Sequence, residues 1–574
     1  MESTIQKPKI LIPLEEIEII PPPSQEESEG KTLNINIGIL GHVDSGKTSL
    51  SKLLSSIAST AAFDKNPQSK ERGITLDLGF SALYLKTPIS LKKYFPNNIK
   101  LNKSDFIQIT IVDCPGHASL IKTVIAGSSI IDTMILVIDA IKGIQTQTVE
   151  CIVLSEILCE KITIAFNKID LLKNDNEIKI KIGKLENIFS KSKFGNDISI
   201  IPISTLNKDD NAIKNLLKSV LLCINFENLD NKNNDNLLAF IDHCFKIKNK
   251  GTIITGTIIK GSVKVNDEVF FPELMDKKQV KEIQIFKKSV KFANKGDRVG
   301  MLIKNLDNDK LERTIICSPS SNECILTEGG LFFIKKIKLF KSELISGNKY
   351  YLMIGNQGVN AKCLFFSNND EKDIFNIFDM KNIKNSKIDI NKFYNKEYFY
   401  IPEIKVEENN EYELAFIKFA QKTIIPNNMI FLGSKIDIDI TQKTNRLAFY
   451  GKMFDNNIKN IVDKLKIFKI KVKEGKILRL VDDDKIAIVK GLFKKDNINI
   501  SNDFIGKEVN IKEDEKKEIV GKILSTFGQS GKIKIEFNEI LSNIKLKDLD
   551  GNDITYKNFN IELSYKKYIK LNKF

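Results

Sequence analysis

The chain has 574 residues, of which 42% are hydrophobic, and a formal net charge of +15. Its length allows about three to five domains, each with its own core, and no run of about 18 uncharged apolar residues marks a membrane span. The positive balance favours a nucleic-acid partner, although a solvated lysine-rich surface would give the same net charge.

The N-terminal segment is acidic and has a run of prolines where a signal peptide has its apolar core. We therefore expect a disordered leader over residues 1–30. The eight cysteines include no C-x-x-C pair and no spacing typical of a zinc site. This pattern predicts buried, reduced thiols in a cytoplasmic protein.

A glycine-rich loop follows the first apolar strand pattern, at Ile35–Leu40. It fits the phosphate-binding template G-x4-G-K-T, and a helical pattern follows it. Glycines let consecutive backbone N–H groups form one concave nest for phosphate oxygens, while the lysine reaches the β and γ phosphates and the threonine ligates Mg2+. We expect the nucleotide to contact Gly41, Val43, Asp44, Ser45, Gly46, Lys47, Thr48 and Ser49.

A second apolar strand pattern, "ITIVDCPGH", ends in an acid and a glycine, Asp113 and Gly116. An acid at this position can hold Mg2+ through water, and a glycine N–H can meet the γ phosphate. Between the loop and this strand, "KERGITLDLGF" places Thr75 where it could close over Mg2+ and the γ phosphate. The order of such a segment would depend on the γ phosphate, which predicts a two-state switch.

A third strand pattern, "KITIAFNKID", ends in Asn167, Lys168 and Asp170. A carboxylate here can accept hydrogen bonds from the N1–H and 2-amino groups of guanine, which adenine does not offer in that arrangement. The predicted nucleotide is therefore GTP. A fourth strand leads to a loop expected to touch guanine O6, and the carboxyl ends of all these strands meet at one edge of a parallel sheet; the loop residues are Ser204, Thr205 and Leu206.

The motifs "GHVDSGKT", "RGIT", "DCPGH" and "NKID" together resemble those of the translational GTPases of the elongation factor Tu class. The resemblance implies that His117 orients the water that attacks the γ phosphate, inside a hydrophobic gate of Val43 and Ile74. It also implies that Asp44 helps to hold a monovalent cation. His42 lies in the phosphate loop, and we assign it only a structural role there. The expected catalytic residues are then His117, Lys47 and Thr75, and the expected Mg2+ ligands are Thr48, Thr75 and Asp113.

Short β patterns broken by glycines dominate the rest of the chain and predict small antiparallel barrels. The first of them is similar to the second domain of elongation factors. The expected fold is an α/β P-loop GTPase domain followed by three β-barrel-rich domains. The predicted domain ranges are 31–228, 238–325, 326–457 and 458–574.

Three features differ from ordinary elongation factor Tu: the switch sequence "RGITLDLGF", the insertion "KTPISLKKYFPNNIKLNKSDF" and a C-terminal tail with "FKKDNI" and "FGQSGK". They resemble the eukaryotic family of selenocysteine-specific elongation factors. The resemblance runs from about Leu33 to the C-terminus and is weaker between about Asn368 and Asn410.

The family resemblance implies a pocket for the aminoacyl group made by Asp242, His243 and Arg298. A selenol ionises well below neutral pH, whereas a serine hydroxyl does not. A positively charged pocket would therefore favour the selenocysteinyl form over its seryl precursor on the same tRNA. The alternative is that Asp242 and His243 cap a strand and Arg298 pairs with an acid.

The tail from Ile461 to Phe574 contains 25 Lys and Arg against 18 Asp and Glu, with lysines interleaved among aromatic residues. This pattern is compatible with RNA contact, although lysine-rich composition alone would also produce it. Runs with a period of two favour a β-barrel over winged helices. By resemblance, the tail works with an adaptor protein that binds the selenocysteine insertion element of the mRNA.

These patterns predict a monomeric cytoplasmic GTPase with GTP or GDP and Mg2+ as cofactors and no membrane partner. By resemblance, it carries selenocysteinyl-tRNA to ribosomes at recoded UGA codons and hydrolyses GTP there. Two alternatives stay open at this point. One is another GTPase that delivers aminoacyl- or initiator tRNA, and the other is a ribosome-bound regulatory GTPase without tRNA.

Overall fold

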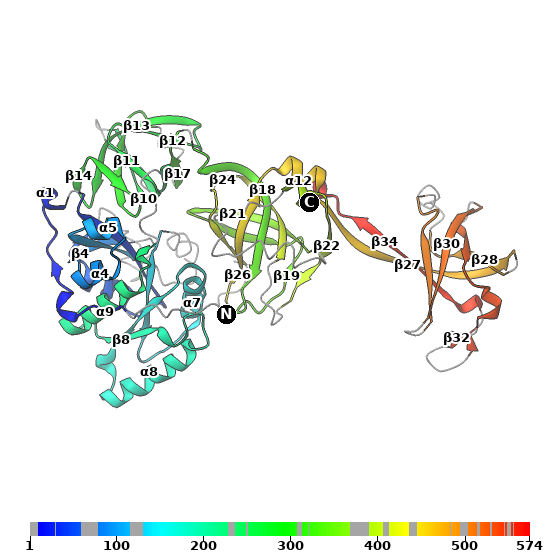
Figure 1. Cartoon of the computed structure of the whole chain (residues 1–574), viewed down its shortest axis with the longest axis horizontal. Coiled ribbons are helices and arrows are strands. Elements are labelled where there is room, and N and C mark those ends of the chain that lie inside the picture. The colour runs from blue at the N-terminus through cyan, green and yellow to red at the C-terminus, as the bar shows by residue number, and fades with distance from the viewer. Residues whose placement is uncertain are drawn as a thin grey trace. The chain divides into compact units, whose positions relative to one another are not determined.

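The structure is a computed structural model (Figure 1). It describes residues 10–28, 30–58, 79–114, 130–227, 236–247, 251–306, 311, 313–319, 321–367, 390–405, 413–435, 445–482, 484–493, 503–513, 517–528, 531–544, 546–547, 553–554 and 556–574. These residues form two compact units. The first takes the described residues up to Phe365 and those of 401–461, and the second takes Phe366, Ser367, those of 390–400 and those from Val462 onward.

The first unit begins with an α/β domain built on one sheet, in the strand order β1-β4-β5-β2-β6-β7-β8. The strands from β5 to β8 run parallel, and every residue of β5, β6 and β7 but one is buried, as expected for strands covered on both faces. The bounds are β1 Ile19–Ile20, β2 Thr32–Gly41, β3 Ile57–Ala58, β4 Gly79–Lys86, β5 Phe106–Asp113, β6 Thr133–Asp139, β7 Ile162–Asn167 and β8 Ser199–Ile203.

Helices cover this sheet, and two short helices lie in the insertion that the sequence showed between β4 and β5. The main helices are α2 Lys47–Leu54, α7 Thr146–Leu158, α8 Asp175–Phe189 and α9 Asp210–Cys223, the insertion helices are α4 Ile89–Tyr94 and α5 Ile99–Lys103, and α1 is Gln25–Ser28. The parallel sheet with helices is the predicted P-loop architecture, with the nucleotide loops at the carboxyl ends of the strands.

The prediction of a disordered leader is wrong for residues 10–28. Ile12 and Ile17 are fully buried in the part of the α/β core that also contains apolar residues of the insertion and of α9. Strand β1 pairs with β4, so the leader adds an edge strand to the sheet. The carboxylate of Glu16 accepts hydrogen bonds from the backbone N–H and the hydroxyl of Ser90, at 2.9 and 2.8 Å. The leader therefore contains a short apolar pattern next to its prolines, and these apolar residues are stabilised by burial against the α/β domain.

Two β-barrels complete the first unit. In the first, strands follow the order β12-β17-β9-β10-β16-β13 and close through a β12–β13 pairing, and in the second the order β20-β25-β26-β18-β24-β21 closes through β20–β21. The bounds are β9 Leu238–Ile247, β10 Gly251–Lys260, β11 Ser262–Lys264, β12 Glu268–Phe271, β13 Asp276–Ile285, β14 Lys288–Val290, β15 Phe292–Asn294, β16 Arg298–Ile303, β17 Thr314–Cys317, β18 Cys324–Lys336, β19 Leu344–Ile345, β20 Lys349–Ile354, β21 Gln357–Ser367, β23 Glu403–Ile404, β24 Glu413–Pro426, β25 Ile430–Ser434 and β26 Leu447–Asp455.

The second unit contains a small barrel of its own, in the order β27-β28-β31-β30-β29-β34, which closes through β27–β34. Its apolar interior forms a separate cluster around Val489, Ile519 and Ile535. The bounds are α11 Ile390–Tyr394, β22 Glu397–Ile401, α12 Ile458–Lys464, β27 Lys466–Val481, β28 Ile486–Lys490, β29 Glu508–Glu513, β30 Lys517–Phe527, β31 Lys532–Phe537, β32 Leu546–Lys547, β33 Asp553–Ile554 and β34 Asn560–Tyr568.

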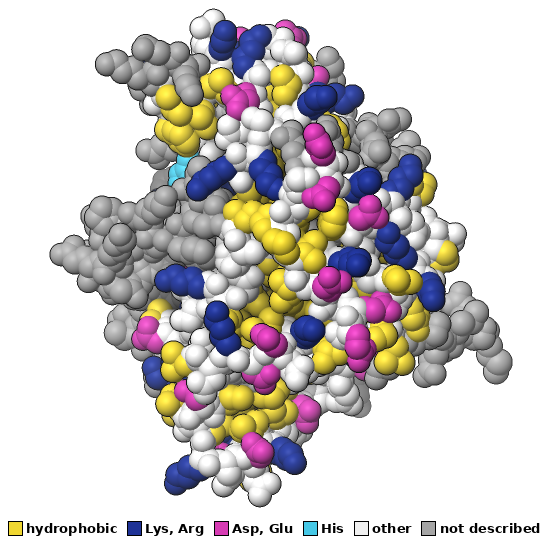
Figure 2. Space-filling model, turned by 90° about the vertical axis from the view of Figure 1, so that its left-hand side faces the viewer, with side chains coloured by type: hydrophobic (Ala, Val, Ile, Leu, Met, Phe, Trp, Pro, Cys, Tyr) yellow, Lys and Arg dark blue, Asp and Glu magenta, His cyan; other side chains and the backbone are white. Residues whose placement is uncertain are grey.

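The predicted fold class is therefore confirmed: an α/β nucleotide domain is followed by three barrel-containing regions. Figure 2 shows that lysine and arginine side chains lie among aspartate and glutamate side chains on one face, so the net charge does not gather there into one basic patch. None of the helices in the described part of the chain is long and apolar enough to cross a bilayer.

Candidate nucleotide site and amino-acid pocket

The phosphate loop connects β2 to α2, and its backbone has an unusual conformation. Gly41 and Gly46 have φ values of 151° and 97°. A Cβ atom at Gly41 would collide with the carbonyl oxygen of Val137, and one at Gly46 would collide with the side-chain amide of Asn167. The loop therefore requires glycine at both positions, and its concave turn is suited to bind an anion through backbone N–H groups.

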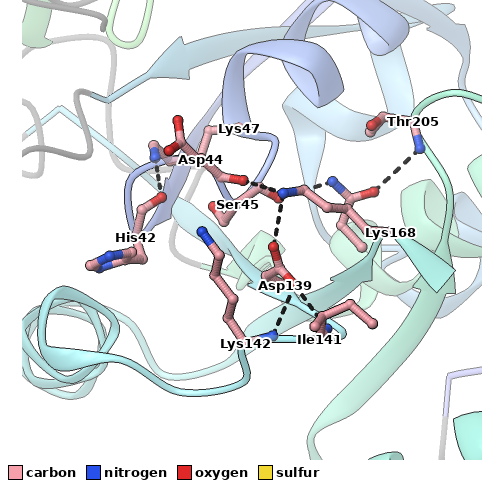
Figure 3. A network of polar contacts seen from close by, with 10 residues as sticks. His42, Asp44, Ser45, Lys47, Asp139, Ile141, Lys142, Lys168 and Thr205 are labelled. Carbon is pink, nitrogen blue, oxygen red and sulfur yellow. Dashed lines mark hydrogen bonds and ion pairs between the residues drawn. The ribbon is translucent and has the colours of Figure 1, made fainter. Parts of the chain in front are cut away.

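Lys47 begins α2 and points back across the loop. Its side chain is buried, and Nζ donates a 2.6 Å hydrogen bond to the carbonyl oxygen of His42 (Figure 3). Burial lowers the pKa of Lys47, while the charge of Asp113 counteracts the shift. Burial and the charge of Lys47 also lower the pKa of His42, which favours the neutral imidazole expected of a structural residue.

Two of the three residues predicted to hold Mg2+ lie together beside the loop. The hydroxyl of Thr48, in the first turn of α2, donates a 2.8 Å hydrogen bond to Oδ2 of Asp113, at the end of β5. A hydroxyl and one carboxylate fit Mg2+, which typically takes few protein ligands and completes its shell with phosphate and water. Among the described residues there is no group of three or more His, Cys, Asp or Glu side chains that could hold a metal ion.

Asn167, the last residue of β7, and Lys168, which follows it, connect the phosphate loop to the base-binding loops. Asn167 Nδ2 donates to the carbonyl oxygen of Ser45 at 2.9 Å, and its Oδ1 accepts the N–H of Thr205 at 3.2 Å. Lys168 Nζ lies 2.5 Å from the carbonyl oxygen of Asp44 (Figure 3). The dashed contacts in the figure thus connect three separate sequence motifs, and the site is organised by its own side chains.

Asp170 is exposed and carries the predicted guanine contact. The hydroxyl of Ser204 donates a 2.5 Å hydrogen bond to its Oδ1 and accepts the N–H groups of Leu206 and Asn207, both at 3.3 Å. Ser204 therefore orients the carboxylate and shapes its own loop at the same time. The structure brings the predicted base-binding residues together in this way.

Two residues of the site were missed by the sequence analysis. Asp139, at the end of β6, forms a 2.8 Å ion pair with Lys168 and accepts N–H groups from Ile141 and Lys142 (Figure 3). Burial raises the pKa of Asp139, but these hydrogen bonds outweigh burial and lower it. Gln147 accepts the N–H of Val43 at 3.2 Å. The signal for Asp139 was present, because it ends an apolar strand just as Asp113 does.

Several predicted residues lie outside the described part of the chain: Ile74, Thr75, Gly116 and His117. The catalytic role of His117, the switch role of Thr75 and the gate between Val43 and Ile74 therefore stay predictions. Ser49 is exposed in the first turn of α2, next to Thr48.

The predicted amino-acid pocket lies where the first barrel meets the α/β domain. Arg298 opens β16 and is only 5% exposed; its Nη1 forms an ion pair with Oδ2 of Asp242 in β9. The guanidinium carbon lies 3.8 Å from the ring centre of Phe80 in β4, a close cation–π contact. The pairing of β9 with β10 shifts at Asp242, because His243 faces Thr255 while Ile241 faces Gly256. This bulge directs Asp242 toward Arg298.

The ion pair with an acid is the alternative that the sequence left open for Arg298, and the structure contains it. It does not use the whole guanidinium, since Nη2 is buried without a hydrogen-bond partner among the described residues. A buried donor without an acceptor is costly. Arg298 is thus held by Asp242 through one guanidinium nitrogen, while the other has no acceptor among the described residues.

The fold and the nucleotide loops define a translational GTPase. A model of the elongation factor Tu GTP-binding domain matches residues 32–244, and a model of elongation factor Tu domain 2 matches residues 251–317. The remaining matches are narrower. The third domain of eukaryotic selenocysteine-specific elongation factors matches residues 331–451, and the eEFSec C-terminal RIFT domain matches residues 463–571.

Whole-chain relatives agree with these matches. A selenocysteine-specific elongation factor of Mus musculus is 36% identical over 543 residues, which cover 88% of each chain. One of Methanocaldococcus jannaschii is 32% identical over 510 residues, covering 88% of this chain and 95% of the relative. The chain belongs to the family of selenocysteine-specific elongation factors, and to its eukaryotic type.

Solved structures of translation elongation factor SelB from Methanococcus maripaludis are also similar. The complex with the GTP analogue GPPNHP has a TM-score of 0.65 and 28% identity, covering 94% of this chain and 99% of that chain. The apo form has a TM-score of 0.63 and 28% identity, covering 94% and 100%. The occurrence of a GTP analogue in a similar structure agrees with GTP as the nucleotide of this chain.

Proposed function

We propose that this GTPase, in its GTP form, binds selenocysteinyl-tRNA, delivers it to ribosomes at recoded UGA codons, and hydrolyses GTP there. Family membership supports the coarse function, which is translation with tRNA and the ribosome as partners. The observation that carries the finer proposal is the second guanidinium nitrogen of Arg298, which is buried and has no acceptor among the residues that the structure describes. A selenolate supplies negative charge and an acceptor at that point, and a serine hydroxyl supplies no charge.

The phosphate loop and Lys47 would bind the β and γ phosphates, while Thr48, Asp113 and Thr75 would hold Mg2+. When bound, Mg2+ neutralises charge on the transferred phosphoryl group. Val43 and Ile74 would keep bulk water from His117, whose imidazole would orient the attacking water. A monovalent cation near Asp44 belongs to the same proposal.

The proposal extends to the organisation of the chain and its remaining partners. After the leader, we propose four domains, at residues 31–228, 238–325, 326–457 and 458–574. The last region would contact RNA, the ribosome or an adaptor that is bound to the selenocysteine insertion element. The protein would act as a cytoplasmic monomer.

The decisive experiment measures protection of the aminoacyl ester from hydrolysis. Selenocysteinyl and seryl esters on the same selenocysteine tRNA are compared with GTP or GDP. Protection of the selenocysteinyl ester alone, and only with GTP, is expected. Equal protection of both esters would keep delivery but remove Arg298 as the discriminator, and protection of neither would favour a regulatory GTPase without tRNA.

A variant of His117 tests the chemical step separately. His117→Ala is expected to bind GTP as tightly as the wild type, because the imidazole contacts the water and not the nucleotide. Its ribosome-stimulated hydrolysis is expected to fall by about a hundredfold or more. Single-turnover GTP hydrolysis with ribosomes measures this loss, and wild-type rates in the variant would remove His117 from the mechanism.

A further inference from the structure

Two cysteines meet at the connection between the first and second barrels of the first unit. Cys317 ends β17, and Cys324 begins β18. Their sulfur atoms lie 3.5 Å apart, while all eight cysteines of the chain are free. A disulfide has an S–S length of about 2.0 Å, so the two sulfur atoms need to approach by about 1.5 Å. The sequence did not suggest this pair, because six residues separate the two cysteines.

The backbone on both sides of the pair is held in place. Cys317 pairs with Leu238 in the first barrel, and Cys324 pairs with Pro426 in the second. At the Cys317 end, the N–H of Leu237 donates to the hydroxyl of Ser318 at 2.8 Å. The two cysteines are therefore held close together by strand pairing and hydrogen bonds.

The connection is held in the same way near Cys324. The N–H of Asn427 donates to the carbonyl oxygen of Glu323 at 2.8 Å. The carboxylate of Glu323 also forms a 2.9 Å ion pair with Lys260. Because both ends are anchored to different barrels, any bond between the sulfur atoms would connect the two barrels directly.

The electrostatics of this pair differ from those of the other thiols. The hydrogen bond from Cys324, and to a smaller extent one from Ser321, lower the pKa of Cys317 to about 7 against the opposing effect of burial. The same hydrogen bond and burial raise the pKa of Cys324. By contrast, burial raises the pKa of Cys151 and Cys159 to about 12. One proton shared between two sulfur atoms leaves a thiolate, the reactive form.

We propose that Cys317 and Cys324 are a reversible oxidation site, at which hydrogen peroxide joins the two barrels through a disulfide. Cys317 is buried and Cys324 is partly exposed, so hydrogen peroxide would have to approach the pair from the side of Cys324. Nothing in the nucleotide site or in the Arg298 pocket uses either thiol, so the inference is independent of the proposed function.

The chemistry balances in two steps. The thiolate of Cys317 attacks one peroxide oxygen, the O–O bond breaks, and the departing hydroxide takes up a proton to become water, which leaves a sulfenic acid on Cys317. The sulfur of Cys324 then attacks the Cys317 sulfur, and the S–O bond breaks. The second hydroxide leaves as water with the proton of Cys324. Two thiols and one peroxide thus give one disulfide and two waters.

The test uses the full chain, titrated with hydrogen peroxide and then alkylated and digested for mass spectrometry. The expected product is a peptide linked between Cys317 and Cys324, formed at least tenfold faster than any other thiol is lost and reversed by dithiothreitol. Cys244 is the internal control, because it is also half-buried but burial raises its pKa to about 11. Oxidation of Cys244 at the same rate, or sulfinic acid without a disulfide, would overturn the proposal.

Variants separate the chemistry from its structural effect. Cys324→Ser is expected to stop at the sulfenic acid of Cys317, which dimedone traps, and Cys244→Ser is expected to behave as the wild type. In the oxidised wild type, the amides between the two cysteines are expected to exchange hydrogen at least tenfold more slowly than in the reduced protein. Unchanged exchange despite a formed disulfide would show that the bond does not join the barrels mechanically.

Discussion

The nucleotide site and the proposed amino-acid pocket at Arg298 are built in different ways. In the nucleotide site, side chains that end the strands of one sheet hold the backbone of neighbouring loops, as Asn167 does for Ser45 and Thr205. In the pocket, one arginine of the first barrel is held by Asp242 of the same barrel and by Phe80 of the α/β domain. The first site depends on local motifs and one domain. The second exists only while two domains stay packed together.

The largest expected effect is confined to the nucleotide site. Asp170→Asn would keep an oxygen for Ser204 but would lose the charged acceptor for two N–H groups of guanine. We expect GTP affinity to fall roughly a thousandfold, or about 4 kcal/mol, measured by titration of a fluorescent GTP analogue. Xanthosine triphosphate is the control, because its 2-carbonyl can accept the new amide N–H. Unchanged GTP affinity in the variant, with no gain in affinity for xanthosine triphosphate, would contradict the role of Asp170.

The next effect concerns the pocket. Arg298→Met would leave the Asp242 carboxylate partly buried without its counter-ion, which costs about 3 kcal/mol. The thermal midpoint of the first unit should fall, while GTP affinity stays within about twofold of the wild type, because the contacts of Arg298 with Asp242 and Phe80 reach no described residue of the nucleotide site.

The double variant Arg298→Met with Asp242→Asn is the matched control for stability. Removing both charges together should restore most of the loss in thermal midpoint, since no unpaired charge remains. Its ester protection should no longer distinguish selenocysteinyl from seryl esters. Retained discrimination in the well-folded double variant would show that the pocket lies elsewhere.

The third prediction concerns the leader, residues 10–28, which packs against the same α/β domain that supplies Phe80. Ile17→Ala removes a fully buried side chain beside the edge strand that pairs with β4, the strand that also carries Phe80. We expect a loss of about 2 kcal/mol in stability, measured by thermal unfolding. Ile19→Ala is the control, because Ile19 is 46% exposed and should change stability by less than about 0.5 kcal/mol. Equal losses would mean that the leader packs less specifically than its contacts indicate.

The smallest effect depends on pH and arises at Asp297, next to Arg298. Burial raises the pKa of Asp297 from 3.8 to about 6, against the N–H of Asn294. The folded state therefore binds more protons than the unfolded state between about pH 4 and pH 6, and stability falls as the pH rises through this window. We expect the free energy of unfolding to change by about 1 kcal/mol. This is less than the full pKa shift would give, because the Asp297 side chain is partly exposed and solvent screens its charge.

The variant Asp297→Asn should remove this fall, which a comparison of thermal midpoints at pH 4.5 and pH 7 measures. In the nucleotide site the hydrogen bonds lower the pKa of Asp139, so its titration lies below this window. The variant should therefore bind GTP as tightly as the wild type at each pH between 5 and 7, because Asp297 is not one of the nucleotide-site residues. A fall in stability that persists in the variant would assign it to another group.

The nucleotide loops, the succession of domains and the family could all be predicted from the amino-acid sequence. Phosphate binding needs glycine, lysine and threonine at fixed spacing, and a parallel sheet always brings its strand ends to one edge, so motifs such as Asn167-Lys168-x-Asp170 can be interpreted without a structure. Asp139 could have been added by the same rule.

Three other features could be seen only in the tertiary structure. They are the folding of residues 10–28 onto the α/β domain, the contact of Arg298 with Phe80, and the pair formed by Cys317 and Cys324. Each depends on side chains that are brought together by packing and have no fixed spacing along the chain. Buried contacts of this kind gain their free energy from the partner surface. The spacing of residues along the chain therefore does not predict them.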